Sequence, residues 1–405
     1  MPRFISKFLL PALLWSMSIE AIPLLERACS TGKAVYFITN DAKNAVAAVS
    51  IGDDGTLSGG TVTATSGKGG NSIDGMTNQP AAPDALVGQS AVSVAGQYLF
   101  AVNAGSNTLS MLSIDEQDPT KLTMIGEPAA VPGEFPNTVA ASMKNKIVCV
   151  GSTGAKTGVS CSSFSKVGLG KMDGLREFDL GQSTPPVGPT NTVSQVLFSN
   201  DESTLLTMVK GDPTVNNTGF VATFPVNRAS QCGPASVSMK GTRSSPAGTA
   251  VLFGTEPIPG TENFFVTDAS FGATVLSLDK KTDGLSTASK QVIDGQKATC
   301  WSTISQVSNS AFVTDVQVNR IVEMSLDNAN IIKEYDTSSI NPGLGFIDLV
   351  SSGNFVYALS PGNGTSEANI VVMDVSAGQG KAKLVQSFGL GALGAGKNSQ
   401  GMATI

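Results

Sequence analysis

Residues 264–279 read FFVTDASFGATVLSLD, and residues 311–327 read AFVTDVQVNRIVEMSLD. Both stretches consist of an apolar run that ends in Thr-Asp, a short turn, and a second apolar run that ends in Ser-Leu-Asp. Two strand-like runs separated by a turn predict an antiparallel hairpin. Clear copies of the same pattern begin at Tyr36, Tyr98 and Phe355. The chain is therefore built from a repeated hairpin.

Weaker copies begin at Lys146 and Thr204, which brings the total to about seven. Repeats of this length, each long enough for four strands, are the signature of a β-propeller. We therefore predict an all-β, seven-bladed propeller of four-stranded blades. Blade 2 is the template, with strands expected at residues 90–95, 97–103, 108–115 and 121–127. The later blades are expected to begin at Pro136, Thr190, Thr249, Ala298 and Gly345.

Blade 1 lacks an inner strand of its own. Its other three strands are expected at residues 34–39, 45–51 and 57–64, and no suitable run precedes Ala34. The C-terminal residues 399–405, SQGMATI, resemble the inner-strand sequences of blades 2 and 6. We therefore expect the C-terminal strand to complete blade 1 and close the ring, because closure removes exposed sheet edges. A frayed tail is the alternative.

The first 21 residues have the pattern of a secretory signal peptide. Arg3 and Lys7 form a basic start, residues 8–17 are apolar, and Ala21 is a plausible cleavage point. The apolar run is too short to span a bilayer. A buried N-terminal helix is the alternative. The expected organisation is a signal peptide over residues 1–21, a lead-in over 22–33 and one propeller domain over 34–405.

We expect the mature protein to be a soluble monomer that is secreted, extracellular or in a cell wall. The two sequons, at Asn216 and Asn363, fall in expected loops and are candidate N-glycosylation sites. Cys149 and Cys161 lie on the two arms of one expected hairpin and are the predicted disulfide. At most two of the other three cysteines can pair, and the remaining one is a buried free thiol or an intermolecular link: Cys29, Cys232 and Cys300.

Composition excludes several classes of function. The chain has no histidine, which rules out Ser-His-Asp and Cys-His catalysis and histidine-bearing zinc sites. The net charge is −6 and there is no basic run, so nucleic acid and anionic membranes are poor partners. A near match to a phosphate-binding loop, Gly391–Asn398, lacks the Ser or Thr and the helix that such a loop needs. We expect no cofactor and no metal, with calcium on channel Asp and Asn residues as the alternative.

Polar residues gather where propellers usually bind, at the mouth of the central channel. In the expected layout this face carries the turns between second and third strands and the loops that enter the inner strands. Ordinary turn chemistry is the alternative explanation for its Asn and Asp residues, and core packing is the alternative for the tryptophan. The channel-mouth binding candidates are Asn40, Asn103, Asn137, Asn319, Lys397 and Trp301. The candidates for catalysis are Arg243, Arg320, Glu134, Asp268 and Asp315.

The stretch from Cys300-Trp301 through AFVTDVQVNRIVEMSLD and GNFVYALSPGNGT to LGAGKNSQGMATI resembles secreted fungal 3-carboxymuconate cyclase-like proteins. These proteins are part of the lactonase-like seven-bladed propellers. The resemblance implies that fold and, nominally, closure of a carboxymuconate to a lactone. Relatives of this kind include fungal cell-wall glycoproteins and antigens. The cyclases use a histidine and arginines in the channel, and the histidine has no counterpart in this chain.

Two functional hypotheses follow. The first is a secreted or wall-associated glycoprotein of surface-antigen or adhesin type that binds a glycan or a protein partner without catalysis. The second is a lactone-forming or lactone-opening enzyme that acts on a small carboxylate in the central channel. In that case Arg243 and Arg320 would hold the carboxylate. Glu134, Asp268 or Asp315 would move the proton.

Overall fold

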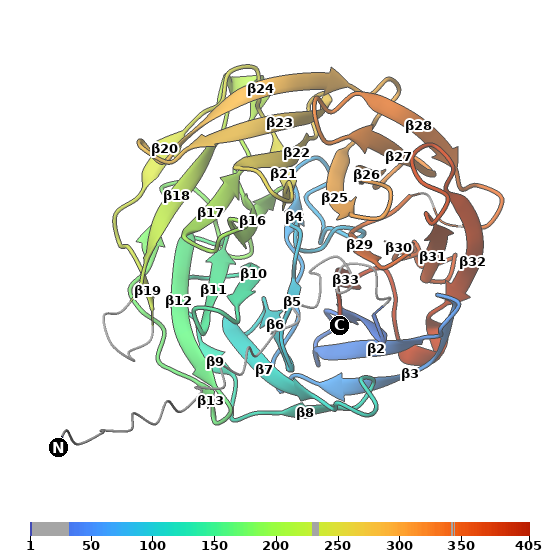
Figure 1. Cartoon of the computed structure of the whole chain (residues 1–405), viewed down its shortest axis with the longest axis horizontal. Coiled ribbons are helices and arrows are strands. Elements are labelled where there is room, and N and C mark those ends of the chain that lie inside the picture. The colour runs from blue at the N-terminus through green and yellow to red at the C-terminus, as the bar shows by residue number, and fades with distance from the viewer. Residues whose placement is uncertain (2–31, 229–234, 342, 344) are drawn as a thin grey trace.

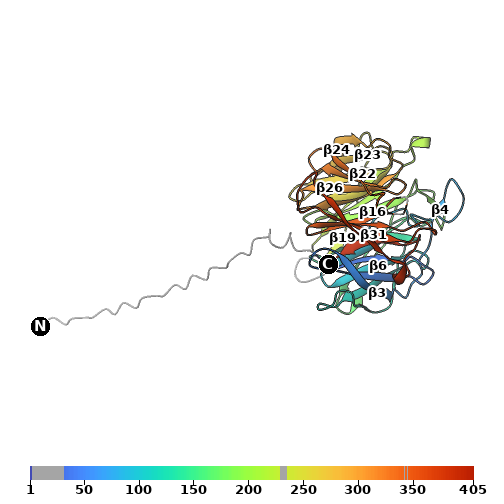
Figure 2. The same ribbon diagram turned by 90° about the vertical axis from the view of Figure 1, so that its right-hand side faces the viewer.

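A computed structural model describes residue 1 and residues 32–228, 235–341, 343 and 345–405. The described chain forms seven four-stranded antiparallel sheets arranged as blades around a central axis (Figure 1). The view from the side shows a disc of stacked blades (Figure 2). The predicted seven-bladed β-propeller is confirmed. The signal-peptide prediction, Cys29 and Cys232 lie outside the described residues.

Each blade is numbered by its place in the sequence. From blade 1 to blade 7 the inner strands are β33 (Gln400–Thr404), β5 (Val92–Ala95), β10 (Pro136–Ser142), β16 (Val193–Phe198), β21 (Leu252–Pro257), β25 (Thr299–Ser305) and β29 (Leu349–Ser352). The second strands are β1 (Ala34–Ile38), β6 (Tyr98–Asn103), β11 (Ile147–Ser152), β17 (Thr204–Val209), β22 (Asn263–Asp268), β26 (Ser310–Asp315) and β30 (Phe355–Ser360).

The third strands follow the second by a short turn in most blades. They are β2 (Ala45–Ile51), β7 (Thr108–Ile114), β12 (Gly158–Ser165), β18 (Phe220–Asn227), β23 (Gly272–Asp279), β27 (Arg320–Ser325) and β31 (Asn369–Asp374). Four blades have an outer strand along most of the third: β3 (Leu57–Ala64), β24 (Gly284–Val292), β28 (Ile331–Asp336) and β32 (Lys383–Gly389). In blade 2 the outer strand β8 (Leu122–Met124) pairs only with Leu112–Ile114 of β7.

The outer edge of the sheet is interrupted in blades 2, 3 and 4. Two short strands pair with β12 in blade 3, and two pair with β18 in blade 4. Blade 2 carries one extra short strand on β7. These pieces are β13 (Gly168–Leu169), β14 (Arg176–Glu177), β19 (Ser236–Val237), β20 (Thr242–Ser244) and β9 (Ala129–Ala130). Two 3-10 turns complete the elements, η1 (Pro213–Val215) and η2 (Gly391–Leu393).

The C-terminal strand closes the ring as predicted. β33 pairs antiparallel with β1, and Tyr36 lies opposite Ala403. The Oγ1 of Thr404 donates a hydrogen bond to the carbonyl of Ala34 at 2.9 Å. Blade 7 is also tied to the far side of blade 1, because the Gln386 side chain bonds both the N–H and the carbonyl of Leu57, at 2.7 and 2.9 Å. The last and first blades are thus joined at both their inner and outer strands.

Apolar side chains between neighbouring blades form the core. One cluster joins blades 6, 7 and 1, and it includes Trp301, Phe346 and Tyr357, none of which is exposed. Trp301 packs edge to face on Phe253 of blade 5, with ring centroids 5.0 Å apart. Burial of each such side chain contributes about 1.5–3 kcal/mol. The sheets are therefore held by face-to-face packing from blade to blade.

The predicted disulfide is confirmed in blade 3. Cys149 on β11 lies directly opposite Cys161 on β12, and the two sulfur atoms are bonded. Cys300 is a buried free thiol, and burial raises its pKa well above the ordinary value, so it is chemically quiet. Within the described residues, no helix has the length and apolar character needed to cross a membrane.

Deletion of residues 399–405 should abolish cooperative folding, because it removes the inner strand of blade 1 and leaves both ends of the ring unpaired. Thermal unfolding followed by circular dichroism measures the effect. Lys397→Ala, a neighbouring exposed change, should leave the melting temperature within a degree or two of the unmodified chain. A truncated protein that melts normally would show that the closing strand is dispensable.

Candidate functional site

A long connector leaves blade 1 at the end of β3 and enters blade 2 at β5. Its middle carries β4 (Ile73–Asp74), which pairs in parallel with β15 (Val187–Gly188) from the connector between blades 3 and 4. Figure 1 shows β4 and the chain that leads to β5 (light blue) at the centre of the ring. Residues 84–90 of this connector lie on the propeller axis, against the inner strands, and are named here the channel plug.

Side chains from three blades hold the first half of the plug. The N–H of Leu86 donates to the Oε1 of Gln400 in blade 1 at 3.0 Å. The carbonyl of Leu86 accepts from the Nδ2 of Asn137 in blade 3 at 3.1 Å. The ammonium of Lys210, at the end of β17 in blade 4, donates to the carbonyl of Val87. Buried main-chain groups need such partners, so the blades satisfy the plug where water is excluded.

The second half of the plug is held by blades 4 and 6. The carbonyl of Gly88 accepts from the Nε1 of Trp301 at 3.3 Å. The N–H of Gln89 donates to the carbonyl of Ser194 at 2.8 Å. The amide side chain of Gln89 then bonds the main chain of Ser302 twice, at 2.8 and 3.1 Å. The side-chain amide of Gln89 therefore pairs with Ser302 of blade 6 in the way that a neighbouring β-strand would, with one donated and one accepted hydrogen bond.

Carboxylates lie at the two ends of the plug. The carboxylate of Asp84 accepts from the Nε2 of Gln400 at 2.8 Å, and burial raises its pKa above the ordinary value. The carboxylate of Asp348, in blade 7, accepts from the N–H groups of Ser90 at 3.4 Å and Met402 at 3.0 Å. Burial raises the pKa of Asp348 to about 7. Blades 1 and 7 thus fix the two ends of the plug.

Lys210 is a fully buried lysine beside the plug. Its ammonium lies 4.5 Å from the centroid of the Phe253 ring, a cation–π distance. Burial lowers its pKa to about 8, and the nearby Asp84 carboxylate opposes that shift. Because the Val87 carbonyl already accepts from the ammonium, this lysine supports the plug.

The plug backbone takes unusual conformations that only tight packing sustains. Asp84, Val87 and Ser90 all have positive φ, and the value for Val87 is 49°. A β-branched residue rarely adopts this region. A Cβ added to Gly88 would lie 2.8 Å from the Nδ2 of Asn137 and 2.9 Å from the carbonyl oxygen of Ser194. Glycine is thus required for this close approach.

The plug fills the central channel of the propeller. Trp301 and Asn137, expected at a ligand-binding mouth, instead hold main-chain groups of residues 84–90. The length and composition of the connector are consistent with this role. The connector is far longer than most connections between strands, and its residues 81–89, AAPDALVGQ, are mostly apolar. A surface loop of that length would be expected to be polar.

The two candidate arginines are not brought together. Arg243 lies on β20 at the outer edge of blade 4, where its guanidinium stacks on Phe220 at 4.6 Å from the ring centroid. Arg320 begins β27 in blade 6 and pairs with Glu334 at 2.9 Å. The expectation that the two arginines hold one carboxylate is wrong, because they lie on different blades and each makes its own structural contact.

The three candidate acids are bound by local donors. Glu134 accepts from Thr184 at 2.6 Å and pairs with Lys156 at 3.4 Å, and these contacts lower its pKa. Asp268 and Asp315 end the second strands of blades 5 and 6. Their carboxylates accept main-chain N–H groups from the loops that enter the inner strands, at 2.6–3.0 Å. Asp268 and Asp315 therefore stabilise the loops that enter the inner strands of their blades.

The remaining channel-mouth candidates are three asparagines with structural hydrogen bonds and one exposed lysine. Asn40 bonds the main chain of Gly70 at 2.9 and 3.1 Å, within the connector. The Asn103 side chain accepts from Asn44 at 2.9 Å, across blades 1 and 2. Asn319 donates to two carbonyls in the loop before β29. Lys397 is exposed. Ordinary turn chemistry accounts for the three asparagines.

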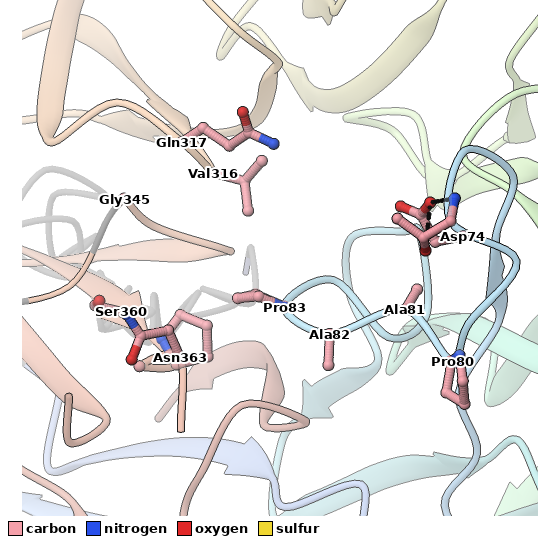
Figure 3. A pocket seen from close by; sticks show the side chains of 13 residues that line it. Asp74, Pro80, Ala81, Ala82, Pro83, Val316, Gln317, Gly345, Ser360 and Asn363 are labelled. Atoms are coloured by element: carbon pink, nitrogen blue, oxygen red, sulfur yellow. Dashed lines mark hydrogen bonds between the residues drawn. The ribbon is translucent and has the colours of Figure 1, made fainter. Parts of the chain in front are cut away.

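A cavity of about 520 Å³ opens on the top face, the face that carries the turns between second and third strands. One wall is the connector, residues 80–83; the others are the turn after β26 and the turn after β30. Figure 3 shows the lining, with Val316 and Gln317 from blade 6 and Asn363 from blade 7. None of the described lining residues is aromatic or basic.

Most polar groups of the cavity lining are uncharged, and Asp74 is the exception. Among the described residues, the side-chain amide of Gln317 makes no hydrogen bond, and the hydroxyl of Ser360 is buried without a partner. The one ionisable lining residue is Asp74, whose Oδ1 accepts from Met76 and Thr77. These bonds lower its pKa, so it is ionised. The described residues contain no cluster of three metal-binding side chains.

Both sequons are accessible. Asn216 is exposed in the left-handed conformation after η1. Asn363 is exposed at the rim of the top-face cavity. Its Oδ1 accepts from the N–H and the hydroxyl of Thr365, at 2.9 and 2.7 Å. The Nδ2 of Asn363, the atom that carries an N-glycan, has no hydrogen-bond partner within the described residues.

Comparisons with known proteins establish the fold and no family. No protein-family model matches the chain, and no curated protein matches it. A candidate 6-phosphogluconolactonase from Bacteroides fragilis is 10% identical with a TM-score of 0.61, over 92% of this chain and 98% of that chain. A second, from Bacteroides uniformis, is 15% identical with a TM-score of 0.52, over 71% and 80%. A functionally unknown protein from Desulfotomaculum acetoxidans is 12% identical with a TM-score of 0.55, over 92% and 98%.

These similarities support a lactonase-like propeller fold. At such low identity the functional residues of these proteins cannot be assigned to positions of this chain, because one fold hosts many activities. The chemistry of this chain must be argued from its own cavities.

Gly88→Ala should destabilise the protein by about 1–3 kcal/mol, because the new methyl group meets the Ser194 carbonyl inside a packed channel. Urea unfolding followed by fluorescence measures the change. Gly396→Ala, where an added Cβ meets nothing within 4 Å, is the matched control and should change stability by less than about 0.5 kcal/mol. Equal unfolding midpoints for the two variants would contradict the packing of the plug.

Proposed function

We propose that this chain is a secreted, non-catalytic propeller that binds a neutral polar partner, most simply a glycan, in the top-face cavity. The single observation behind this proposal is that residues 84–90 fill the central channel. Partners for their main chain come from blades 1, 3, 4, 6 and 7. A channel occupied in this way leaves its mouth as a binding surface.

The cavity lining favours binding over chemistry. Its polar groups are amides and hydroxyls, and they suit the hydroxyls of a sugar. Its apolar walls are formed by Pro80, Pro83 and Pro361. Among the described lining residues the one carboxylate is that of Asp74, and its lowered pKa makes it a poor proton acceptor. No second titratable group that could act as its acid partner is present among these residues.

Secretion to the medium or to a fungal cell wall is the cellular part of the proposal. It rests on the basic and apolar pattern of residues 1–21 and on the two exposed sequons. The resemblance to 3-carboxymuconate cyclase-like wall glycoproteins is consistent with it.

The alternative is a lactonase. It is favoured by the fold neighbours described as candidate 6-phosphogluconolactonases, and it includes lactone formation as well as lactone opening. A substrate panel of 3-carboxymuconate and simple lactones, 6-phosphogluconolactone among them, separates the two proposals. Turnover well above a heat-killed control would overturn the non-catalytic reading.

Gln317→Ala should weaken glycan binding about tenfold, because it removes one unpaired amide from the cavity. A glycan array identifies the ligand and calorimetry gives the affinity. Gln117→Ala, an exposed glutamine in blade 2, is the matched control and should bind normally. Equal binding by both variants, or capture of proteins and no glycan, would sink the glycan assignment.

Expression in a eukaryotic host should yield protein in the medium with N-glycans on Asn216 and Asn363. Mass spectrometry after glycosidase treatment in heavy-oxygen water marks each glycosylated asparagine. Asn363→Gln should lose one glycan and keep the other. Recovery of the protein only from the cytosol, without glycan, would contradict secretion.

A further inference from the structure

A second cavity lies on the bottom face, which carries the turns between inner and second strands. It has a volume of about 360 Å³. It is lined by the last residues of β10, β16 and β21 and by the start of blade 2. Ser90, the last residue of the plug, contributes to its lining. The plug therefore separates this cavity from the top-face cavity.

Glu256 is the unusual residue of this cavity. It is the penultimate residue of β21 and is only partly exposed. Among the described residues its carboxylate makes no hydrogen bond and no ion pair. The neighbouring amide of Gln195 is already used, because it accepts from the Thr255 N–H at 2.7 Å and donates to the Ser90 hydroxyl at 3.3 Å. A carboxylate left without partners in a partly buried site is costly to ionise.

The ionisable groups that line the cavity are both acidic. They are Glu202 and Glu256, and no lysine or arginine is among the described lining residues. The carboxylate of Glu202 accepts from the Ser142 hydroxyl. Asp348 is buried nearby and raises the pKa of Glu256, after burial itself, to about 8. The cavity thus lacks the positive charge that would balance its carboxylates.

The walls select among possible cations. Val139, Val196, Leu197 and Pro257 give the cavity an apolar side. Two carboxylates are too few for a hard metal ion, which takes six or more oxygen ligands in the case of calcium. An alkyl chain that ends in an ammonium matches both features, because its stem packs on apolar walls and its head pairs with a carboxylate.

We propose that the bottom-face cavity binds a primary alkylammonium group, carried by a lysine side chain or by a free diamine, with Glu256 as its counter-ion. This site is distinct from the glycan-binding cavity and does not depend on it. Binding neutralises the one carboxylate that the fold leaves unpaired in this cavity.

The proposal has a defined pH dependence. The ammonium binds the ionised form of Glu256, so affinity rises as pH rises through the pKa of about 8. The ionised fraction of such a group is about one-tenth at pH 7 and about nine-tenths at pH 9, which predicts about tenfold tighter binding. Glu202 and Asp348 are the other titratable groups facing the site; β5, β10 and β16 contribute none to its lining.

Calorimetry on the full chain tests the site with 1,5-diaminopentane and with N-acetyl-lysine methylamide, at pH 7 and pH 9. At least one ligand should bind, about tenfold tighter at pH 9. Binding of the diamine alone assigns a free amine, and binding of the lysine derivative assigns a protein side chain. Binding of neither ligand, or equal affinity at both pH values, would overturn the proposal.

Glu256→Gln should abolish the binding, and Glu116→Gln should retain it. Glu116 is exposed on blade 2, so its substitution makes the same charge change away from the cavity. Glu256→Gln removes a carboxylate that has no partner to lose, so the variant should melt at or above the temperature of the unmodified chain. Undiminished binding by a folded Glu256→Gln protein would rule out Glu256 as the counter-ion.

Discussion

The buried main chain of residues 84–90 must find hydrogen-bond partners, and much of the centre of this propeller is arranged to supply them. Five of the seven blades contribute a donor or an acceptor to this segment. The groups include a side-chain amide, an indole, an ammonium and a carboxylate. An unpaired buried main-chain group costs about 1–3 kcal/mol. The inner strands are therefore matched to one particular segment, and Gly88 is the residue that allows the closest approach.

A filled channel changes where function can reside. The arginines and acids that would suit an enzyme are spread over several blades, and each has a structural partner. Among the cavities of the described chain, one on each face differs in character from the other. The top-face cavity offers mainly amides and hydroxyls beside one carboxylate, whereas the bottom-face cavity offers two carboxylates and apolar walls. Ligands of different chemistry can therefore be recognised by one rigid ring.

The fold could be predicted from sequence because hairpin periodicity is a local signal. The strands of blade 2 lie within two or three residues of their expected bounds, and the C-terminal strand completes blade 1 as expected. The Cys149–Cys161 pair was predictable for the same reason, since both residues are on one hairpin. The site was not predictable. The plug depends on contacts between residues more than 200 positions apart, such as Gly88 with Trp301, and no local pattern encodes them.

The hydrogen bond between Gly88 and Trp301 also has a consequence for folding during synthesis. The ribosome makes the plug before blades 3 to 7 exist, and its last partner, Gln400, is among the final residues of the chain. Contacts of such high sequence separation form slowly. The apolar stretch at residues 85–87 lacks its partners until Gln400, 314 positions after Leu86, has been made. A protein built in this way completes its centre late, and we expect it to need chaperone protection until the ring has closed.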